Sequence, residues 1–151
     1  MENNLQLPTD YFISDKLDDM QLKVVHQYLS QESYWAKNIS FELVQRAAAN
    51  SINFGVFYKE QQVGYARVIT DHATFGYLAD VYILNEHRGK GLSKCLMQAI
   101  QQHPELQVQR RFVLVTADAH GLYEQFDWKA VAHPSRYMEK VKANPYLSTT
   151  H

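Results

Sequence analysis

The stretch Arg88-Gly89-Lys90-Gly91-Leu92-Ser93 decides how this sequence folds, because it joins two segments of different character. The segment before it, roughly Phe75 to Leu84, is predicted to be a strand. After it, apolar residues follow the i, i+3, i+4 spacing of an amphipathic helix: Leu92, Cys95, Leu96, Ala99 and Ile100. The sequence therefore predicts a strand, a loop with two glycines, and a helix.

Such a loop has the physical properties of an anion site. The first turn of a helix has unpaired N–H groups and a partial positive charge, and glycine lets a phosphate approach the backbone closely. Arg88 and Lys90 add full positive charge. The alternative is a turn that needs glycine only for its geometry. The glycine spacing fits neither a P-loop nor the three-glycine dinucleotide pattern.

The other predicted elements surround this unit on both sides. Ser40 is expected to cap one helix, and another helix is expected whose apolar pattern begins at Met20, with the acids Asp18-Asp19 at its start. The predicted strands lie near 11–13, 52–58, 63–69, 112–115 and, last, Tyr137-Met138-Glu139, with a short helix over 119–126. The order β-α-α-β-β-β-α-β-α-β predicts an α/β fold, in which helices flank a mixed central sheet.

Composition fits one soluble domain over residues 1–151. Hydrophobic residues make up 46% and charged residues 21%, and the formal net charge is -1, which favours neither nucleic acid nor membranes as partners. The N-terminal residues lack the pattern of a signal peptide, and no apolar run could span a bilayer, so we expect a cytoplasmic location.

Several kinds of chemistry are disfavoured by the residue patterns. The seven histidines have no metal-ligand spacing, so we expect no metal site. The single cysteine, Cys95, lies on the apolar face of its helix and is interpreted as buried and inert. No Gly-x-Ser-x-Gly sequence is present, which disfavours a serine hydrolase.

The loop resembles the pyrophosphate loop of the GNAT superfamily of N-acetyltransferases, Q/R-x-x-G-x-G/A. Arg88 and Gly91 match, while Ser93 replaces the last small residue. The preceding segment, 81–86, looks like the family's fourth strand. The segment from Leu122 to Trp128 looks like its later L-Y-E-K-x-G-F motif, with Asp and Trp replacing Gly and Phe. The resemblance covers about residues 54–128.

The resemblance implies that acetyl-CoA lies where the fourth and fifth strands splay apart. The backbone near Ile83 and Leu84 would then pair with the pantetheine arm. The pyrophosphate would be held by the loop and helix start, Arg88, Gly89, Lys90, Gly91, Leu92 and Ser93. No metal is implied.

It also implies direct attack of a neutral amine on the thioester. A backbone N–H near Ile83 would hold the carbonyl oxygen, and Tyr123 matches the tyrosine that protonates the leaving thiolate. Asp80 is the candidate base, with Tyr77 and Asp71 as alternatives. The acids and bases just before Tyr123 are interpreted as structural: Asp118 as a helix cap, and His120 as a local contact.

The acceptor is not defined by the residues. Tyr34 and Trp35, between the first two helices, could clasp a substrate or cover the sheet edge. The predicted activity is acetyl transfer to a primary amine of a small molecule, peptide or protein, by a monomer or homodimer. A non-catalytic acyl-CoA sensor is the alternative from another class, and an unrelated phosphate-binding fold is a third interpretation.

Overall fold

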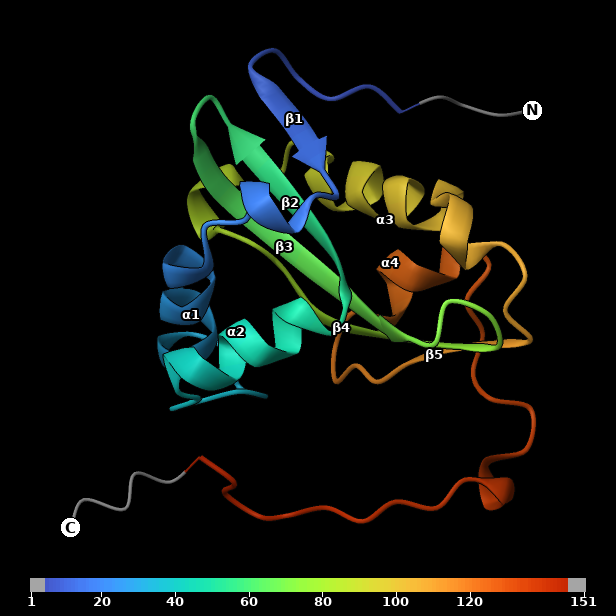
Figure 1. Cartoon of the computed structure of the whole chain (residues 1–151). Coiled ribbons are helices and arrows are strands. Elements are labelled where there is room, and N and C mark those ends of the chain that lie inside the picture. Colours follow the sequence, from blue (N-terminus) through green and yellow to red (C-terminus); the bar gives the residue numbers. More distant parts are fainter. Residues whose placement is uncertain (1–4, 147–151) are drawn as a thin grey trace, which may run out of the picture.

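The computed structural model describes residues 5–146, and its centre is one mixed five-stranded sheet with the spatial order β1-β2-β3-β4-β5 (Figure 1). The strands are β1 (Tyr11–Ser14), β2 (Ile52–Tyr58), β3 (Gln61–Thr70), β4 (Phe75–Ile83) and β5 (Arg111–Leu114). The first three pairs of neighbours are antiparallel and β4–β5 is parallel. The parallel pair needs a crossover, which the third helix provides.

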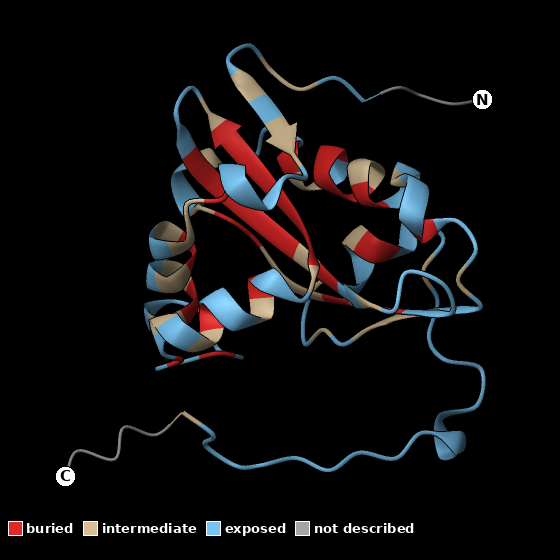
Figure 2. Ribbon diagram, viewed as in Figure 1, coloured by how far each residue is buried: buried red, intermediate tan, exposed pale blue. Residues whose placement is uncertain are grey.

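Two helical layers cover the two faces of the sheet and make two separate cores. One core packs α3 (Leu92–Gln102) and α4 (His120–Glu124) against strands β2 to β4. The other packs α1 (Leu22–Gln31) and α2 (Phe41–Ala49) against the opposite face. The strands β2 and β3 are therefore buried on both faces (Figure 2). This arrangement confirms the predicted mixed α/β sheet with helices on both faces.

The helix starts follow local capping chemistry, with one difference from the prediction. Ser40 caps α2 as expected, because its side chain accepts a hydrogen bond from the N–H of Leu43. The first helix begins at Leu22, and Asp18-Asp19 belong to a separate 3-10 helix, Leu17–Asp19. The break arises because the backbone N–H groups of Gln21 and Gln62 each donate to the other residue's side chain, which ties the chain to β3.

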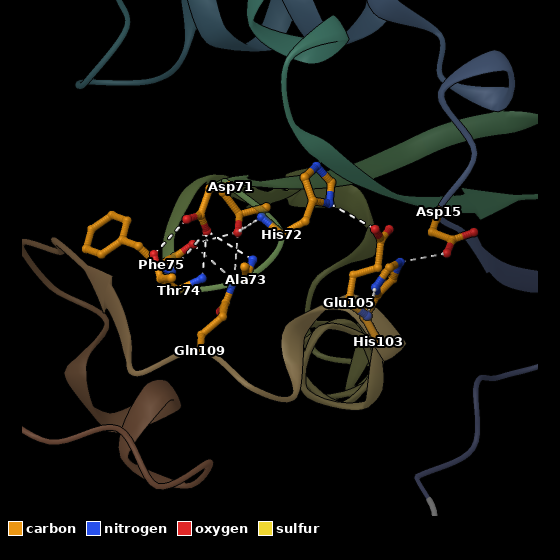
Figure 3. Close-up of polar contacts among 10 residues, drawn as sticks. Asp15, Asp71, His72, Ala73, Thr74, Phe75, His103, Glu105 and Gln109 are labelled. Atoms are coloured by element: carbon orange, nitrogen blue, oxygen red, sulfur yellow. Dashed lines mark hydrogen bonds and ion pairs between the residues drawn. The ribbon is translucent and has the colours of Figure 1, made fainter.

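The hairpin between β3 and β4 is held by the carboxylate of Asp71 (Figure 3). This carboxylate accepts hydrogen bonds from the Thr74 hydroxyl and from the backbone N–H groups of Thr74, Ala73 and Phe75. These bonds, that of the Thr74 side chain first, hold the pKa of Asp71 well below its usual range. Asp71 lies at the opposite end of β4 from the glycine loop and serves the turn.

Two ion pairs fix α3 relative to the sheet in the same region. His72 in the hairpin meets Glu105 at 3.0 Å, and His103 at the end of α3 meets Asp15, just after β1, at 3.0 Å (Figure 3). The end of α3 is therefore tied both to the β3–β4 hairpin and to the opposite edge of the sheet.

The predicted last strand at Tyr137-Met138-Glu139 is wrong for the described chain. These residues belong to no strand, and the sheet ends at β5. All residues from 129 to 145 are exposed, and the segment runs outside the body of the protein (Figure 2). A strand requires a hydrogen-bonding neighbour, and within residues 5–146 no strand pairs with this segment.

Candidate active site

The sheet opens between β4 and β5. Their parallel pairing runs from Phe75↔Arg111 to Leu78↔Leu114 and ends there. β4 continues to Ile83, where β3 is its only strand partner in the described part of the chain. The last residues of β4 therefore have one edge free of strand pairing. This confirms the predicted splay between the fourth and fifth strands.

A β-bulge in β4 lies at the start of this opening. Tyr65 pairs with Tyr82 and Arg67 with Ala79, so Asp80 and Val81 lie opposite the single residue between them on β3. Asp80 has a φ of 56°, which L residues rarely adopt. The extra residue shifts the alternation, so that Leu78 and Ile83 both point into the α3 core. β-Bulges are common beside functional sites, where they change the direction in which the side chains of a strand point. No feature of the sequence predicted this bulge.

A cleft of about 180 Å³ lies at the end of β4, beside the glycine loop and the start of α3. Its lining residues are Ile83, His87, Arg88, Gly89, Gly91, Leu92, Ser93, Lys94 and Leu122. The fold thus brings six of the eight predicted cofactor residues together. Leu84 and Lys90 do not line the cleft; the N–H of Leu84 donates to the Val63 carbonyl at 2.8 Å.

The two glycines give the loop its shape. Gly89 and Gly91 both have φ of 78°, the left-handed region that favours glycine. A Cβ atom at either position would meet no heavy atom within 4 Å, so both face open space. Gly91 is the N-cap of α3 and offers no capping side chain. The first-turn N–H groups of α3 are therefore available to an anion, which is the arrangement that phosphate groups favour.

Arg88 faces back toward the strand rather than outward. Its Nε donates to the Ile83 carbonyl at 2.9 Å, and a terminal nitrogen lies 3.4 Å from the Tyr28 hydroxyl on α1. These contacts tie the loop to the end of β4 and to the other helical layer. Lys94 lines the cleft and supplies positive charge at the helix start.

His87 ties the loop to β1, the strand at the far edge of the sheet. Its Nδ1 lies 2.6 Å from the hydroxyl of Tyr11 on β1, and its ring packs near those of Tyr11 and Tyr58. The sequence reasoning missed His87, Lys94 and Leu122. The two residues beside the glycine motif could have been found from their proximity to it, whereas Leu122 reaches the cleft only through the packing of α4.

Tyr123 lies in α4, one residue after the cleft residue Leu122. Its side chain is only 8% exposed. Burial, together with the smaller effects of the neighbouring Tyr34 and Asp118, raises the pKa of Tyr123 to about 12. The phenol therefore carries its proton at neutral pH, as a proton donor must.

The start of α4 is capped differently from the prediction. The N-cap is Ala119, and no side chain caps it in the usual way. Instead the Thr116 hydroxyl accepts from the N–H groups of Asp118 and Ala119, at 3.4 and 3.1 Å. The interpretation of Asp118 as a helix cap is therefore wrong. Its carboxylate acts on Tyr123 through charge.

Asp80 is held on both carboxylate oxygens. One accepts from the Trp35 indole N–H at 2.7 Å, and the other pairs with Arg67 Nε at 2.5 Å. The side chain of Asp80 is only 10% exposed, so its carboxylate is nearly buried and is held by two hydrogen-bond donors. Asp80 lies at the bulge in β4, three residues before the strand ends at Ile83.

The Tyr34-Trp35 pair spans the opening of the sheet. Trp35 bonds Asp80 on β4, while the Tyr34 hydroxyl accepts from the N–H of Ala117, beyond the end of β5, at 3.2 Å. The two rings pack edge to face at 5.0 Å. The link between α1 and α2 therefore bridges the two sides of the splay, so the pair lies at the site rather than on a distant sheet edge.

Other chemistries find no support in residues 5–146. No group of three or more histidine, cysteine and acidic side chains there could hold a metal ion. Cys95 is buried, as expected, and burial raises the pKa of its thiol. Within the described chain, no helix has the length and apolar character needed to cross a bilayer.

A mixed sheet that opens at a parallel pair, with a glycine loop and a helix start beside the opening, fits the class of acyl-coenzyme A-dependent transferases. Comparison with known proteins agrees. The GNAT acetyltransferase domain matches residues 16–149. A Gibberella zeae protein named as an acetyltransferase is 34% identical over 137 residues, which cover 76% of each chain.

Solved structures extend the likeness to the whole fold. A GNAT-family acetyltransferase structure from Xanthomonas campestris is 44% identical, with a TM-score of 0.91 over 95% of this chain and 100% of that one. An acetyltransferase structure with acetyl-CoA from Clostridium acetobutylicum shares the fold at 13% identity, with a TM-score of 0.64 over 87% and 94% of the two chains. The protein belongs to the GNAT acetyltransferase family, whose members use acetyl-CoA.

Proposed function

We propose that this protein transfers the acetyl group of acetyl-CoA to a primary amine, with Tyr123 as the proton donor. The observation that carries the proposal is the single opening at the end of β4, which has the glycine loop on one side and the helix of Tyr123 on the other. An acyl carrier and an acid must meet in one place for this reaction, and the proposal is supported by the position of the glycine loop and of the helix that carries Tyr123 beside the same cleft.

The loop fits the pyrophosphate of coenzyme A. Open space over Gly89 and Gly91 lets two phosphates approach the first-turn N–H groups of α3, up to Ser93. Lys90 and Lys94 balance the charge of the phosphates. Arg88 acts by fixing the loop to Ile83. The thioester supplies an activated acyl group when acetyl-CoA is bound.

The free edge of β4 fits the pantetheine arm. Beyond Leu78 this edge has no strand partner within residues 5–146, so its backbone groups are open to a ligand's amides. Ile83 lines the cleft, and a backbone N–H near it would hold the carbonyl oxygen as negative charge develops. Leu84 contributes packing, because its own N–H is bonded to β3.

Protons move at two positions. Tyr123 keeps its phenolic proton at neutral pH, because burial raises its pKa to about 12, and it would stabilise the departing thiolate by donating a hydrogen bond or its proton. Asp80 is the proposed acceptor of the amine's proton, directly or through water. Trp35 and Arg67 orient its carboxylate at the bulge, where the α1–α2 link meets β4.

A non-catalytic acyl-CoA sensor would share the loop and lack the turnover. The deciding experiment incubates the protein with acetyl-CoA and a panel of amines, small molecules and peptides with free amino groups, and measures free thiol. We expect amine-dependent thiol release and a matching acetylated product. Binding of coenzyme A with no product from any amine would support the sensor. Failure of coenzyme A to raise the melting temperature would reject both.

Replacement of Asp80 tests the base separately. Asp80→Asn keeps the size of the side chain and removes its basicity, and Trp35→Phe removes one of its two donors. We expect Asp80→Asn to lower kcat about a hundredfold or more, and Trp35→Phe to lower it less. An unchanged kcat in both variants would assign the proton to another group.

A further inference from the structure

His87 lines the cleft beside the glycine loop, and contacts with the first two strands hold its ring in place. Its Nδ1 lies 2.6 Å from the hydroxyl of Tyr11 on β1, a residue 76 positions away in the chain. The ring centroid lies 5.7 Å from that of Tyr11 and 5.5 Å from that of Tyr58 at the end of β2. The backbone is fixed as well, because the N–H of His87 donates to the Leu84 carbonyl at 2.9 Å. The position of this imidazole is therefore set by the fold before any ligand binds.

The contact with Tyr11 decides which nitrogen of the His87 ring remains available. A phenol oxygen is a weak acceptor and an unprotonated imidazole nitrogen is a strong one, so the Tyr11 O–H donates and Nδ1 accepts. In a neutral ring the proton then lies on Nε2, because the hydrogen bond at one ring nitrogen sets the tautomer. In a charged ring both nitrogens carry protons. Nε2 is thus a donor in either form, and within residues 5–146 the His87 ring makes no other hydrogen bond.

The guanidinium of Arg88, the residue that follows His87, is engaged by the protein itself. Its Nε donates to the Ile83 carbonyl at 2.9 Å, and its two terminal nitrogens each lie 3.4 Å from a side-chain oxygen. Lys94, another cationic lining residue, has an exposed side chain on α3. Among the basic side chains that line the cleft, His87 is therefore the one that is half-buried and keeps a ring nitrogen without a partner in the described chain.

We propose that His87 is a further binding residue for the cosubstrate, and that its Nε2–H donates a hydrogen bond to the pyrophosphate of coenzyme A. Tyr11 is then a positioning residue, because its hydroxyl holds the ring in the tautomer and orientation that this contact needs. The inference rests on the proposed function, since it requires coenzyme A in this cleft. It adds a side-chain donor to the backbone N–H groups of the loop and of the first turn of α3.

The pyrophosphate is the part of coenzyme A that lies within reach of this donor. His87 precedes Gly89 by two residues and Gly91 by four, and all three line one cleft. The first-turn N–H groups of α3 belong to the chain after the glycines, whereas His87 ends the 3-10 helix Asn85–His87 before them. Donors therefore come from both sides of the loop. A hydrogen bond from an imidazole N–H to a charged phosphate oxygen is stronger than one between neutral groups.

Calorimetric titration of the full chain with coenzyme A measures the contribution of His87. His87→Ala should raise the dissociation constant about tenfold or more. A glutamine places its amide nitrogen near the position of Nε2, and an asparagine places it near that of Nδ1. His87→Gln should therefore restore most of the affinity, and His87→Asn should not. His72→Gln, at an exposed histidine in the β3–β4 hairpin, is the matched control and should bind as the wild type does.

Dephospho-coenzyme A, which keeps the pyrophosphate and lacks the 3′-phosphate, identifies the phosphate that His87 contacts. We expect His87→Ala to lose the same factor in affinity for both ligands. An unchanged dissociation constant, a loss confined to coenzyme A itself, or rescue by asparagine and not by glutamine would each overturn the proposal. A wild type that binds no coenzyme A would reject the proposed function as well, whereas equal binding by the wild type and His87→Ala rejects only the role of His87.

The positioning role of Tyr11 is tested by a double-mutant cycle. Tyr11→Phe keeps the ring and removes the hydroxyl, so we expect a roughly threefold rise in the dissociation constant when His87 is present and no further loss in His87→Ala. Tyr58→Phe is the matched control, because in the described chain the hydroxyl that it removes makes no hydrogen bond to His87. Additive losses, or an unchanged dissociation constant in Tyr11→Phe, would overturn this role. Far-ultraviolet circular dichroism checks that every variant is folded.

Discussion

Replacing Gly91 by alanine separates the shape of the loop from its binding role. Gly91 has a φ of 78°, and a Cβ there would meet no atom of the protein within 4 Å. The only cost to the folded state is therefore the left-handed backbone, about 1–2 kcal/mol for an L residue. For a domain of this size, each kcal/mol lowers the melting temperature by roughly 2–4 °C.

The effect on coenzyme A arises from a different cause. The new methyl group occupies the open space that a phosphate needs in order to reach the first-turn N–H groups of α3. Backbone strain is present with and without ligand and cancels from the dissociation constant, so a loss of affinity reports the methyl group itself. We expect the dissociation constant to rise about tenfold or more, which is a loss of about 1.4 kcal/mol.

Thermal unfolding with and without coenzyme A measures both quantities. At a ligand concentration of about one hundred times the wild-type dissociation constant, the wild type gains about 2.7 kcal/mol, whereas a tenfold weaker variant gains only about half as much. Gly121→Ala is the matched control, because its Cβ also meets no atom and it lies within α4, where alanine adds about 0.5–1 kcal/mol. Equal ligand-induced stabilisation of wild type and Gly91→Ala would refute the assignment of this loop to the pyrophosphate.

Three further perturbations test the proton donor and the charges that the fold creates. Tyr123→Phe should lower kcat about a hundredfold or more with little change in coenzyme A affinity. Steady-state kinetics measures the first quantity and calorimetry the second. An unchanged kcat would remove the phenol from the mechanism. Burial raises the pKa values of Tyr65, Tyr82 and Tyr123, to about 12 for Tyr123. The stability that these neutral phenols contribute is therefore fully present below pH 10, and it is lost as the pH rises toward the pKa values of the folded state. Absorbance at 295 nm should show that these tyrosines titrate late, and titration of every tyrosine near pH 10 would contradict their burial. The lowered pKa of Asp71 has the opposite effect on stability: the Asp71 carboxylate stabilises the fold above about pH 4, and this stabilisation is lost as the pH falls. Asp71→Asn should therefore be less stable than the wild type at pH 7, and its stability should fall less in acid. Equilibrium unfolding at neutral and at acidic pH measures both differences.

Much of the fold could be predicted from local patterns. The amphipathic spacing of Leu92 to Ile100 and the cap at Ser40 depend only on near neighbours in the chain, and both are found in the structure. The strand order and the splay followed from family resemblance around the glycine loop. The early start expected for α1 was wrong because Gln62, 41 residues away from Gln21, holds the chain there.

The site was predictable to the extent that it is contiguous in the chain. Gly89 and Gly91 mark the loop directly, since a left-handed φ selects glycine. The partners of Asp80 were not predictable, because Trp35 and Arg67 lie on other elements and meet it only in the folded sheet. The bulge at Asp80 has no local signal, because it follows from the register between β3 and β4.

Residues adjacent in the chain therefore predicted most of the elements and the glycine loop, and the resemblance to the GNAT family selected Tyr123 as the candidate proton donor. The folded arrangement set the remaining features: the raised pKa of Tyr123, the bridge that Tyr34 and Trp35 make across the opening, and the absence of a strand partner for Met138 in the described chain. These properties depend on burial, on charge and on hydrogen-bonding neighbours that come from distant segments, and such neighbours exist only once the sheet has formed.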